Sequence, residues 1–374
     1  METNYPDIAH RYDYATIQRA GAYWDRFVAK TFERIDVNGL ERLASLAPDT
    51  SVVLTSDHRS HLDYVLLALT LYHANLPPRI NGQPRPLAIA AGDNLFKRFG
   101  KWDFGDLIRR LGAYKIIRKP AEGEKKRVLL AQAAYTAERM DAGDWFLLFP
   151  GKGRSYSGEL MPFDTGAVGL FLHAERKVER PVAYVPVSIS YERSPEDRWF
   201  RGFSAYKAQN EPSWSQQALY YGRDWPMIWF QQHFNKSLGN ANIAFGQPVT
   251  STQNGTRHTK ESLTELLEHE AARNLVAYPT AIFAAALQRD PTFEHVYGHV
   301  YDLQSDLRLL GAVDKVRNPH AIAFRALRFL DAPWRRFVVP RKDRYEIRRP
   351  EVIDYYANTI KHHIAKCHVP TLQS

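Results

Sequence analysis

His58 and Asp63 stand five positions apart, directly after the apolar run 52–54. This order predicts a buried strand that ends in a turn and opens a helix over 62–71. A carboxylate bonded to one ring nitrogen fixes the histidine tautomer and leaves the other nitrogen as a base. Such a pair can take a proton from an alcohol that attacks a thioester or ester carbonyl. The spacing alone also fits an ordinary helix N-terminus, with Asp63 in the first turn and His58 exposed.

Two arginines follow apolar, strand-like runs. Arg118 follows residues 114–117, and Arg154 comes shortly after residues 145–149. Arginine at the end of a strand can grip a phosphate with paired donors. Gly151 and Gly153 allow a tight turn and a close backbone approach to a ligand. An isolated arginine is more often a solvated surface side chain. Here the neighbouring glycines, together with the four sequence blocks described next, favour a phosphate-binding role.

Four sequence blocks occur in order along the chain, at residues 58–64, 91–119, 149–158 and 184–191. This ordered set resembles the glycerolipid acyltransferase superfamily, whose first block has the form HxxxxD. The first block reads His-Arg-Ser-His-Leu-Asp-Tyr and is most similar to the membrane-associated bacterial glycerol-3-phosphate acyltransferases. The motifs carry the resemblance over residues 50–250, and the helical tail is compatible with it.

The resemblance implies that His58 is a general base and Asp63 its orienting carboxylate. The hydroxyl of glycerol 3-phosphate would attack the thioester of acyl-CoA or acyl carrier protein directly, as a step of phospholipid biosynthesis. No covalent acyl-enzyme is needed, and neither a metal nor an organic cofactor is expected. The positions implied to bind substrate are Arg118, Gly153, Arg154 and Ser155 on the acceptor side, Pro186 on the acyl-donor side, and Lys152 as an added charge.

The third block departs from the family pattern Phe-Pro-Glu-Gly-x-Arg-Ser. Gly151 occupies the glutamate position and Lys152 the glycine position, while Tyr156 replaces a second arginine. Three interpretations follow. The acceptor is a lysophospholipid or another hydroxyl or amine; Lys152 adds a third phosphate-binding charge; or the protein binds acyl groups or lipids without catalysis. Retention of both His58 and Asp63 argues against the last, because binding alone requires neither.

Composition limits the class of protein. The 374 residues suffice for one large domain or two small ones, and 44% hydrophobic residues can build a core. The single cysteine, Cys367, excludes an internal disulfide framework and fits a reducing compartment. No run of about 18 apolar residues occurs, and residues 2–7 do not resemble a signal peptide. We expect a cytoplasmic protein whose membrane contact, if any, is peripheral and on the cytoplasmic face.

The C-terminal part is strongly basic within a chain of net charge +9. Aromatic residues are interleaved with the basic ones, as in surfaces that meet anionic lipid headgroups. The segment could equally attract the phosphates of coenzyme A or an acidic carrier protein, or be a solvated basic face. No nucleic-acid motif accompanies it, so no nucleic-acid partner is expected. The basic residues are Arg325, Arg328, Arg335, Arg336, Arg341, Lys342, Arg344, Arg348 and Arg349.

The apolar patterns alternate between strand and helix periods. Strands are predicted near 51–55, 86–91, 113–117, 145–149, 182–191 and 242–246. Helices are predicted near 12–35, 61–74, 104–111, 125–141, 166–177 and from 259 to about 330, with a surface loop over 193–215. Alternation of this kind predicts an α/β fold: a mixed, largely parallel sheet flanked by helices, with an N-terminal helix and a helical C-terminal extension.

The predicted organisation has three parts: an N-terminal helical segment over 1–48, an α/β domain over 49–256 and a helical extension with a basic tail over 257–374. Ligands of such sheets bind beyond the strand ends, where His58, Arg118 and Arg154 are predicted. His295 and His299 have the helical i, i+4 spacing that can bind metal. No acidic or cysteine ligand is obvious beside them, so we expect no metal site.

Overall fold

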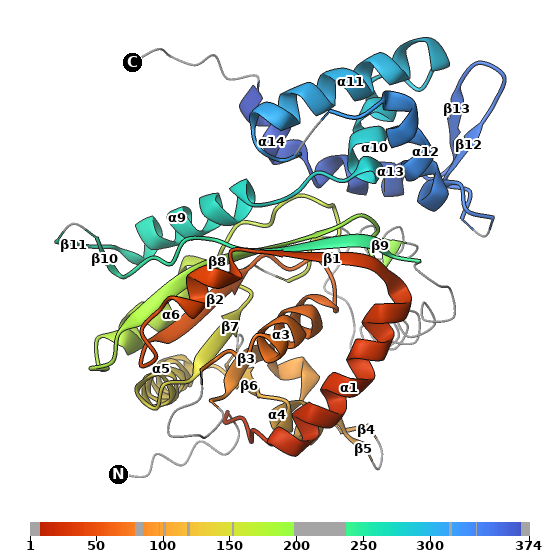
Figure 1. Ribbon diagram of the computed structural model, residues 1–374. Helices are drawn as coiled ribbons and strands as arrows, with labels where there is room; N and C mark the ends of the chain where they lie inside the picture. Colours follow the sequence, from red (N-terminus) through yellow and green to blue (C-terminus); the bar gives the residue numbers. More distant parts are fainter. Residues whose placement is uncertain are drawn as a thin grey trace.

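Seven strands form one mixed sheet in the order β1-β9-β8-β2-β7-β3-β6 (Figure 1). Neighbouring strands run parallel except for β8 and β9, which pair antiparallel. The predicted α/β fold with a mixed, largely parallel sheet is thus confirmed. The strands are β1 (Phe32–Asn38), β2 (Ser51–Ser56), β3 (Leu87–Gly92), β6 (Ala113–Ile116), β7 (Trp145–Leu148), β8 (Val182–Tyr191) and β9 (Gly239–Phe245).

The computed structural model describes residues 8–78, 85–96, 98–99, 102–117, 120–151, 153–197, 237–253, 255–313, 316–333 and 335–367. Two of the predicted substrate-binding residues, Arg118 and Lys152, lie outside these ranges. The stretch 225–230, which contains Trp225, Trp229 and Phe230, also lies outside them.

Helices cover both faces of the sheet, and the strands bury side chains on both. In β2, Val52 and Leu54 join a core with α1 and α3, whereas Val53 joins the core under α5, α6 and α9. Strands buried on both faces read as continuous apolar runs, which explains why they were visible in the sequence. The helices of these layers are α1 (Tyr14–Thr31), α2 (Leu40–Ala44), α3 (Asp63–His73), α4 (Phe104–Arg110), α5 (Lys125–Asp141), α6 (Thr165–Glu175) and α9 (Lys260–Arg273).

The C-terminal helices form a bundle of their own beside the sheet, drawn in blue in Figure 1. Their core includes Phe283, Leu303 and Tyr356, all buried. The bundle consists of α10 (Pro279–Arg289), α11 (Phe293–Leu309), α12 (Pro319–Leu330), α13 (Pro350–Asn358) and α14 (Lys361–Cys367), with a hairpin of β12 (Val338–Pro340) and β13 (Tyr345–Ile347). Within the described ranges, no helix has both the length and the apolar character that crossing a bilayer requires.

Several arginines of the basic C-terminal segment form ion pairs with carboxylates, two of which come from distant parts of the chain. Arg335 is buried against Asp197 at 2.6 Å, and Arg325 meets Glu192 at 2.5 Å. The exposed Arg341 pairs with Glu346 within the hairpin. At these three positions the basic side chains are therefore paired with carboxylates of the protein.

Two local predictions were wrong. The helix predicted over 12–35 ends at Thr31, and residues 32–38 form β1 at the edge of the sheet. The pairing of β1 with β9 is irregular between Phe32 and Arg34, which hides the two-residue period of a strand. The surface loop predicted over 193–215 is wrong for residues 193–197, because these side chains are buried. Residues 198–215 lie outside the described ranges.

Candidate active site

The turn between β2 and α3 carries the histidine and aspartate singled out in the sequence. His58 lies two residues after the end of β2, and Asp63 is the first residue of α3. The Nδ1 atom of His58 donates to Oδ2 of Asp63 at 2.7 Å. The aspartate side chain is fully buried, whereas the histidine side chain retains 17% exposure. One ring nitrogen is thus fixed by the carboxylate, which leaves Nε2 to act as a base.

Both carboxylate oxygens of Asp63 are held in place. The backbone N–H groups of Arg59 and Ser60 donate to Oδ2 at 2.6 and 2.9 Å. The hydroxyl of Tyr191, at the end of β8, donates to Oδ1 at 2.7 Å. Burial, and then the Asp63 charge, raise the pKa of Tyr191 far above its usual value, so the phenol stays protonated and remains a donor. Tyr191 is a site residue that the sequence prediction did not include.

The third sequence block lies directly against this turn. The ring of Phe149 packs on the imidazole of His58, with centroids 4.5 Å apart. The backbone N–H of Ser155 donates to the carbonyl of His58 at 2.8 Å. The two segments meet because β2 and β7 are parallel neighbours, so the loops after them leave the same end of the sheet.

Arg154 lies beside the turn, but its guanidinium already has partners. Nη1 donates to Glu196 at 3.1 Å and Nη2 to the hydroxyl of Tyr156 at 2.8 Å. The same carboxylate accepts from Ser60 Oγ at 3.1 Å and from the backbone N–H of His61 at 3.0 Å. A carboxylate therefore stands next to Arg154, although the third block has glycine where the family pattern has glutamate. This carboxylate belongs to Glu196, within the segment 193–215 that the sequence predicted to be a surface loop.

Comparison with known proteins gives a family for this region. Residues 34–190 match the family model described as Acyltransferase. This stretch of the chain is therefore similar to the acyltransferases, which supports the superfamily predicted from the four ordered sequence blocks. The crystal structure of the 1-acyl-sn-glycerophosphate (LPA) acyltransferase PlsC from Thermotoga maritima is among the similar solved structures. It has 18% sequence identity and a TM-score of 0.38, and the match covers 68% of this chain and 76% of that chain.

Three further residues of the predicted substrate-binding set lie in the described ranges: Gly153, Ser155 and Pro186. Ser155 is buried, and its hydroxyl donates to the carbonyl of Glu159 at 2.6 Å. Gly153 has a φ of 121°, a conformation that glycine adopts without strain. Pro186 pairs with Thr55 inside the sheet, one position before the end of β2. Of the predicted set, His58, Asp63, Arg154 and Ser155 are thus connected around one turn.

A buried ion pair between Arg59 and Asp57 stabilises the turn that carries His58 and connects it to the C-terminal bundle. Arg59 donates to Asp57 at 2.5 Å and to the carbonyl of Gly158 at 3.2 Å. Gly158 has a φ of 85°, and an added Cβ there would clash with the carbonyl oxygen of Tyr355 in α13. Burial raises the pKa of Asp57 above its usual value. The bundle therefore packs against the loop that holds the acyltransferase turn in shape.

Proposed function

We propose that the protein is an O-acyltransferase that moves a fatty acyl group from acyl-CoA or acyl carrier protein to glycerol 3-phosphate. The bond between His58 and the buried Asp63 carries this proposal. Nε2 of His58 takes the proton of the acceptor hydroxyl as its oxygen attacks the thioester carbonyl carbon. The carbon–sulfur bond then breaks, and the protonated imidazole returns the proton to the leaving thiolate. Asp63 keeps the tautomer correct and stabilises the transient imidazolium.

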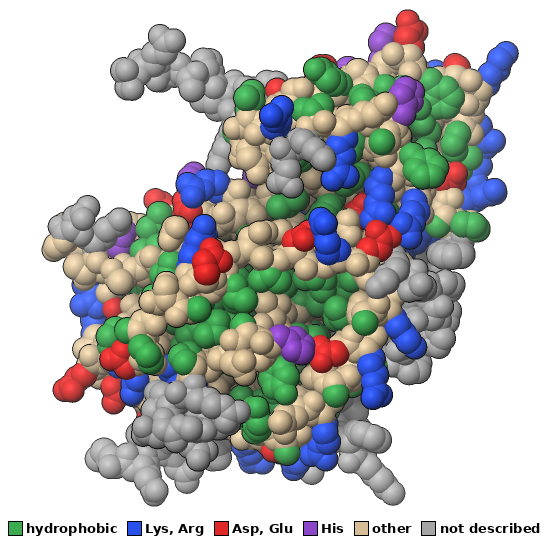
Figure 2. All heavy atoms as spheres, viewed as in Figure 1, with side chains coloured by type: hydrophobic (Ala, Val, Ile, Leu, Met, Phe, Trp, Pro, Cys, Tyr) green, Lys and Arg blue, Asp and Glu red, His purple; other side chains and the backbone are tan. Residues whose placement is uncertain are grey.

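An apolar pocket next to α3 supports a fatty acyl substrate. Its volume is about 380 Å³, and aliphatic side chains of α1, β1, α2 and α3 line it. Figure 2 shows hydrophobic side chains gathered below β1, between α1 and α3. Leu66, Thr70 and His73 from this lining follow Asp63 at positions i+3, i+7 and i+10, so they share its face of α3. We propose that the acyl chain enters here and that this face meets the membrane peripherally, on the cytoplasmic side.

The pocket assignment has its own test. Thr70→Trp fills the pocket, and we expect it to shift the preferred donor from palmitoyl-CoA to shorter acyl-CoA chains. Thr256→Trp, an exposed position on the hairpin of β10 (Thr252–Gln253) and β11 (Thr256–Arg257), is the matched control and should leave the preference unchanged. An unaltered chain-length profile in Thr70→Trp contradicts this placement of the chain.

The acyltransferase proposal is tested by transfer from palmitoyl-CoA to glycerol 3-phosphate in purified protein. We expect His58→Ala to lose at least about a hundredfold in rate, the usual share of a general base. His295→Ala is the control, since His295 also pairs with an aspartate five positions away, at 3.1 Å, but is exposed in the bundle. Equal turnover in His58→Ala and the wild type rules out the mechanism. If no acceptor gives product with acyl-CoA or acyl carrier protein, a non-catalytic binding role is supported.

A second acceptor class is favoured by the pairing of Arg154. Its guanidinium is already bonded to Glu196, so an acceptor phosphate would have to compete with that carboxylate. The alternative is an acyltransferase acting on a lysophospholipid or on another hydroxyl or amine, and this pairing favours the phosphate-free acceptors among them. An acceptor panel with Glu196→Gln separates the two. If the phosphate binds Arg154, the variant lowers KM for glycerol 3-phosphate and leaves phosphate-free acceptors unchanged. Better turnover of phosphate-free acceptors by the wild type supports the alternative.

A further inference from the structure

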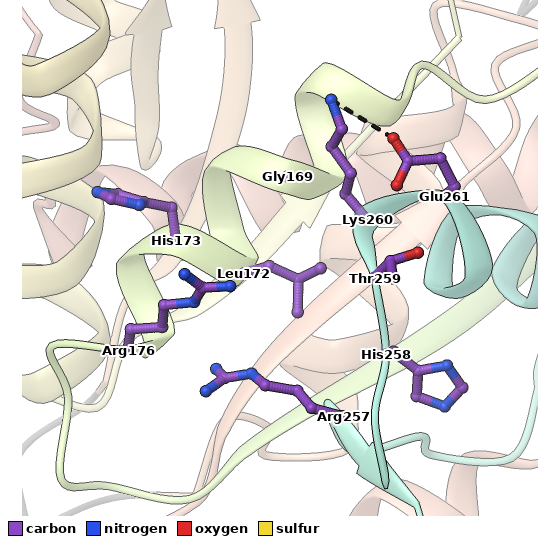
Figure 3. Close-up of a pocket in the computed structure, with 9 residues that line it drawn as sticks. All are labelled: Gly169, Leu172, His173, Arg176, Arg257, His258, Thr259, Lys260 and Glu261. Atoms are coloured by element: carbon purple, nitrogen blue, oxygen red, sulfur yellow. Dashed lines mark ion pairs between the residues drawn. The ribbon is translucent and has the colours of Figure 1, made fainter.

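A second pocket lies at the far end of the sheet, between α6 and the segment that leads into α9 (Figure 3). Its volume is about 490 Å³. Leu172 from α6 lies at its centre, and Arg176 and Arg257 extend into the space beneath it from opposite sides (Figure 3). Arg176 directly follows α6, and Arg257 ends β11 (Thr256–Arg257).

The two guanidinium groups face one hollow, and no carboxylate of the described part of the chain is drawn between them (Figure 3). Among the described residues, neither Arg176 nor Arg257 has an ion-pair partner, in contrast to Arg325, Arg335 and Arg341. Glu175, next in sequence to Arg176, is engaged elsewhere: its carboxylate accepts the hydroxyl hydrogens of Tyr184 and Ser251. Like charges held close together are mutually unfavourable, and an anion between them removes that cost.

The start of α9 forms another edge of the pocket, where the Lys260 ammonium pairs with Glu261 (Figure 3). Lys260 is its first residue, and the aliphatic part of that side chain lies against α6, where a Cβ on Gly169 would be 3.2 Å from Cδ. The 14-residue helix directs the positive end of its dipole towards this side. His173 and His258 complete the titratable groups of the lining. Among the described lining residues, Glu261 is the one carboxylate, and it lies 3.5 Å from the Lys260 ammonium.

This pocket is remote from the acyltransferase turn. Tyr184, which contacts Glu175 beside the pocket, and Tyr191, which contacts Asp63, both belong to β8. Seven residue steps in a strand span about 23 Å at roughly 3.3 Å per residue. A molecule bound between the two arginines therefore does not reach His58 unless it is long and extended.

We propose that this pocket binds a phosphate-bearing anion, separately from the substrates at His58. Paired guanidinium groups match the planar, two-point recognition of phosphate oxygens. The volume exceeds what a phosphate group alone fills and lies in the range of small-molecule sites, so the phosphate carries an organic substituent. A soluble phosphate ester and a phospholipid headgroup share this chemistry. The proposal stands whether or not the acyltransferase function does.

The first test is calorimetric titration of the full-length protein with pyrophosphate. Removing both pocket charges in the double variant Arg176→Gln/Arg257→Gln should weaken binding at least about tenfold, equivalent to about 1.4 kcal/mol. The matched control is Arg289→Gln/Arg308→Gln, which removes two exposed arginines from α10 and α11 and gives the same net charge. It should bind as the wild type does. His58→Ala should also bind pyrophosphate normally, because that variant alters only the other site.

The second arm uses co-sedimentation with vesicles of phosphatidylglycerol and phosphatidylcholine. Loss of vesicle binding in the pocket variant, with the control unaffected, identifies the ligand as a lipid headgroup. Loss of pyrophosphate binding with unchanged vesicle binding identifies a soluble phosphate ester. If the pocket variant and the control match in both assays, the proposal is overturned. It is also overturned if the wild type binds neither pyrophosphate nor vesicles.

Discussion

His58 and His10 lie at opposite ends of the same sheet, and both have a carboxylate nearby. His58 follows the end of β2 and donates to Asp63, with part of its ring exposed. His10 lies at the start of β7, where Nδ1 bonds the Tyr135 hydroxyl at 2.6 Å and Nε2 is 3.6 Å from Asp144. Nδ1 of His10 is thus hydrogen-bonded within the protein, and its Nε2 faces a buried carboxylate.

The comparison indicates that the general-base role proposed for His58 depends on access as well as on pairing. The side chain of His10 is only 6% exposed, and burial, helped by the charge of Arg139, lowers its pKa to about 4. Asp144 is itself held by two bonds from Arg139. His10 therefore joins the N-terminal segment to α5 as a neutral group. His58 combines a fixed tautomer with a reachable Nε2, which the proposed mechanism requires.

The strongest test of this contrast is Asp63→Asn. The amide cannot stabilise an imidazolium, and it permits the wrong tautomer of His58, so we expect kcat to fall about a thousandfold with KM little changed. The same substitution in the catalytic triad of a serine protease lowers kcat by about 10⁴. Asp290→Asn, in the exposed pair with His295, is the control and should keep full activity. If kcat falls by less than about tenfold in Asp63→Asn, His58 does not depend on Asp63 for its function.

The buried ion pair that attaches the bundle next to the acyltransferase turn should be important for stability. Arg335→Met leaves the buried Asp197 carboxylate without this partner, so we expect the free energy of unfolding to fall by about 3 kcal/mol. The exposed pair of Arg341 and Glu346 provides the control, and Arg341→Met should cost less than about 1 kcal/mol. Urea denaturation measures both. Equal losses in the two variants would show that burial does not distinguish these pairs.

His10 should make stability depend on pH in a defined window. Its folded-state pKa of about 4 lies below the ordinary value of 6.5, so protons favour the unfolded chain. The stabilisation is complete above pH 6.5 and is lost as the pH falls towards 4, by about 3 kcal/mol at most. His10→Gln, which cannot titrate, should lose less stability between about pH 7 and pH 4.5 than the wild type does. Parallel pH curves for the two proteins would contradict the assignment.

Tyr191→Phe should have the smallest effect. It removes the hydrogen bond to Oδ1 of Asp63 and leaves the bonds to Oδ2, so we expect kcat to fall about tenfold with KM unchanged. A purely structural role would lower stability without changing the pH profile of kcat, which should shift in this variant. Tyr72→Phe, on α3 but away from the pair, serves as the control. Wild-type kcat and an unshifted profile would remove Tyr191 from the site.

The sequence was sufficient where the relevant residues are neighbours in the chain. The apolar run 52–54, the turn and the start of α3 placed His58 and Asp63 correctly, because all the geometry is local. The doubly buried strands of the sheet were visible as continuous apolar runs for the same reason. Local pattern failed at β1, where an irregularity at Phe32 and Arg34 obscures the strand period.

Contacts between distant segments were beyond the sequence prediction. Glu196 meets Arg154 and the turn from a stretch rich in charged and turn-forming residues, which reads as solvated loop. Tyr191 ends an apolar strand, and nothing near it in sequence signals a partner 128 positions away. The ion pairs of the basic C-terminal segment were equally hidden, since Asp197 and Glu192 meet Arg335 and Arg325 only after folding. Charge pairing of this kind depends on topology.

The position of β9 between β1 and β8 determines the order in which these strands can join the sheet during synthesis. In the sheet as described, β1 is an edge strand and has β9 as its neighbour, although about two hundred residues separate them in the chain. At about 5–20 residues per second, a ribosome needs roughly 10–40 s to make that stretch. β8 ends at Tyr191, so its apolar edge is open to other chains only in the last part of this interval, until β9 has been made. The strand that leaves the ribosome first is therefore among the last to dock, and the nascent protein should depend on chaperones until residue 245 has emerged.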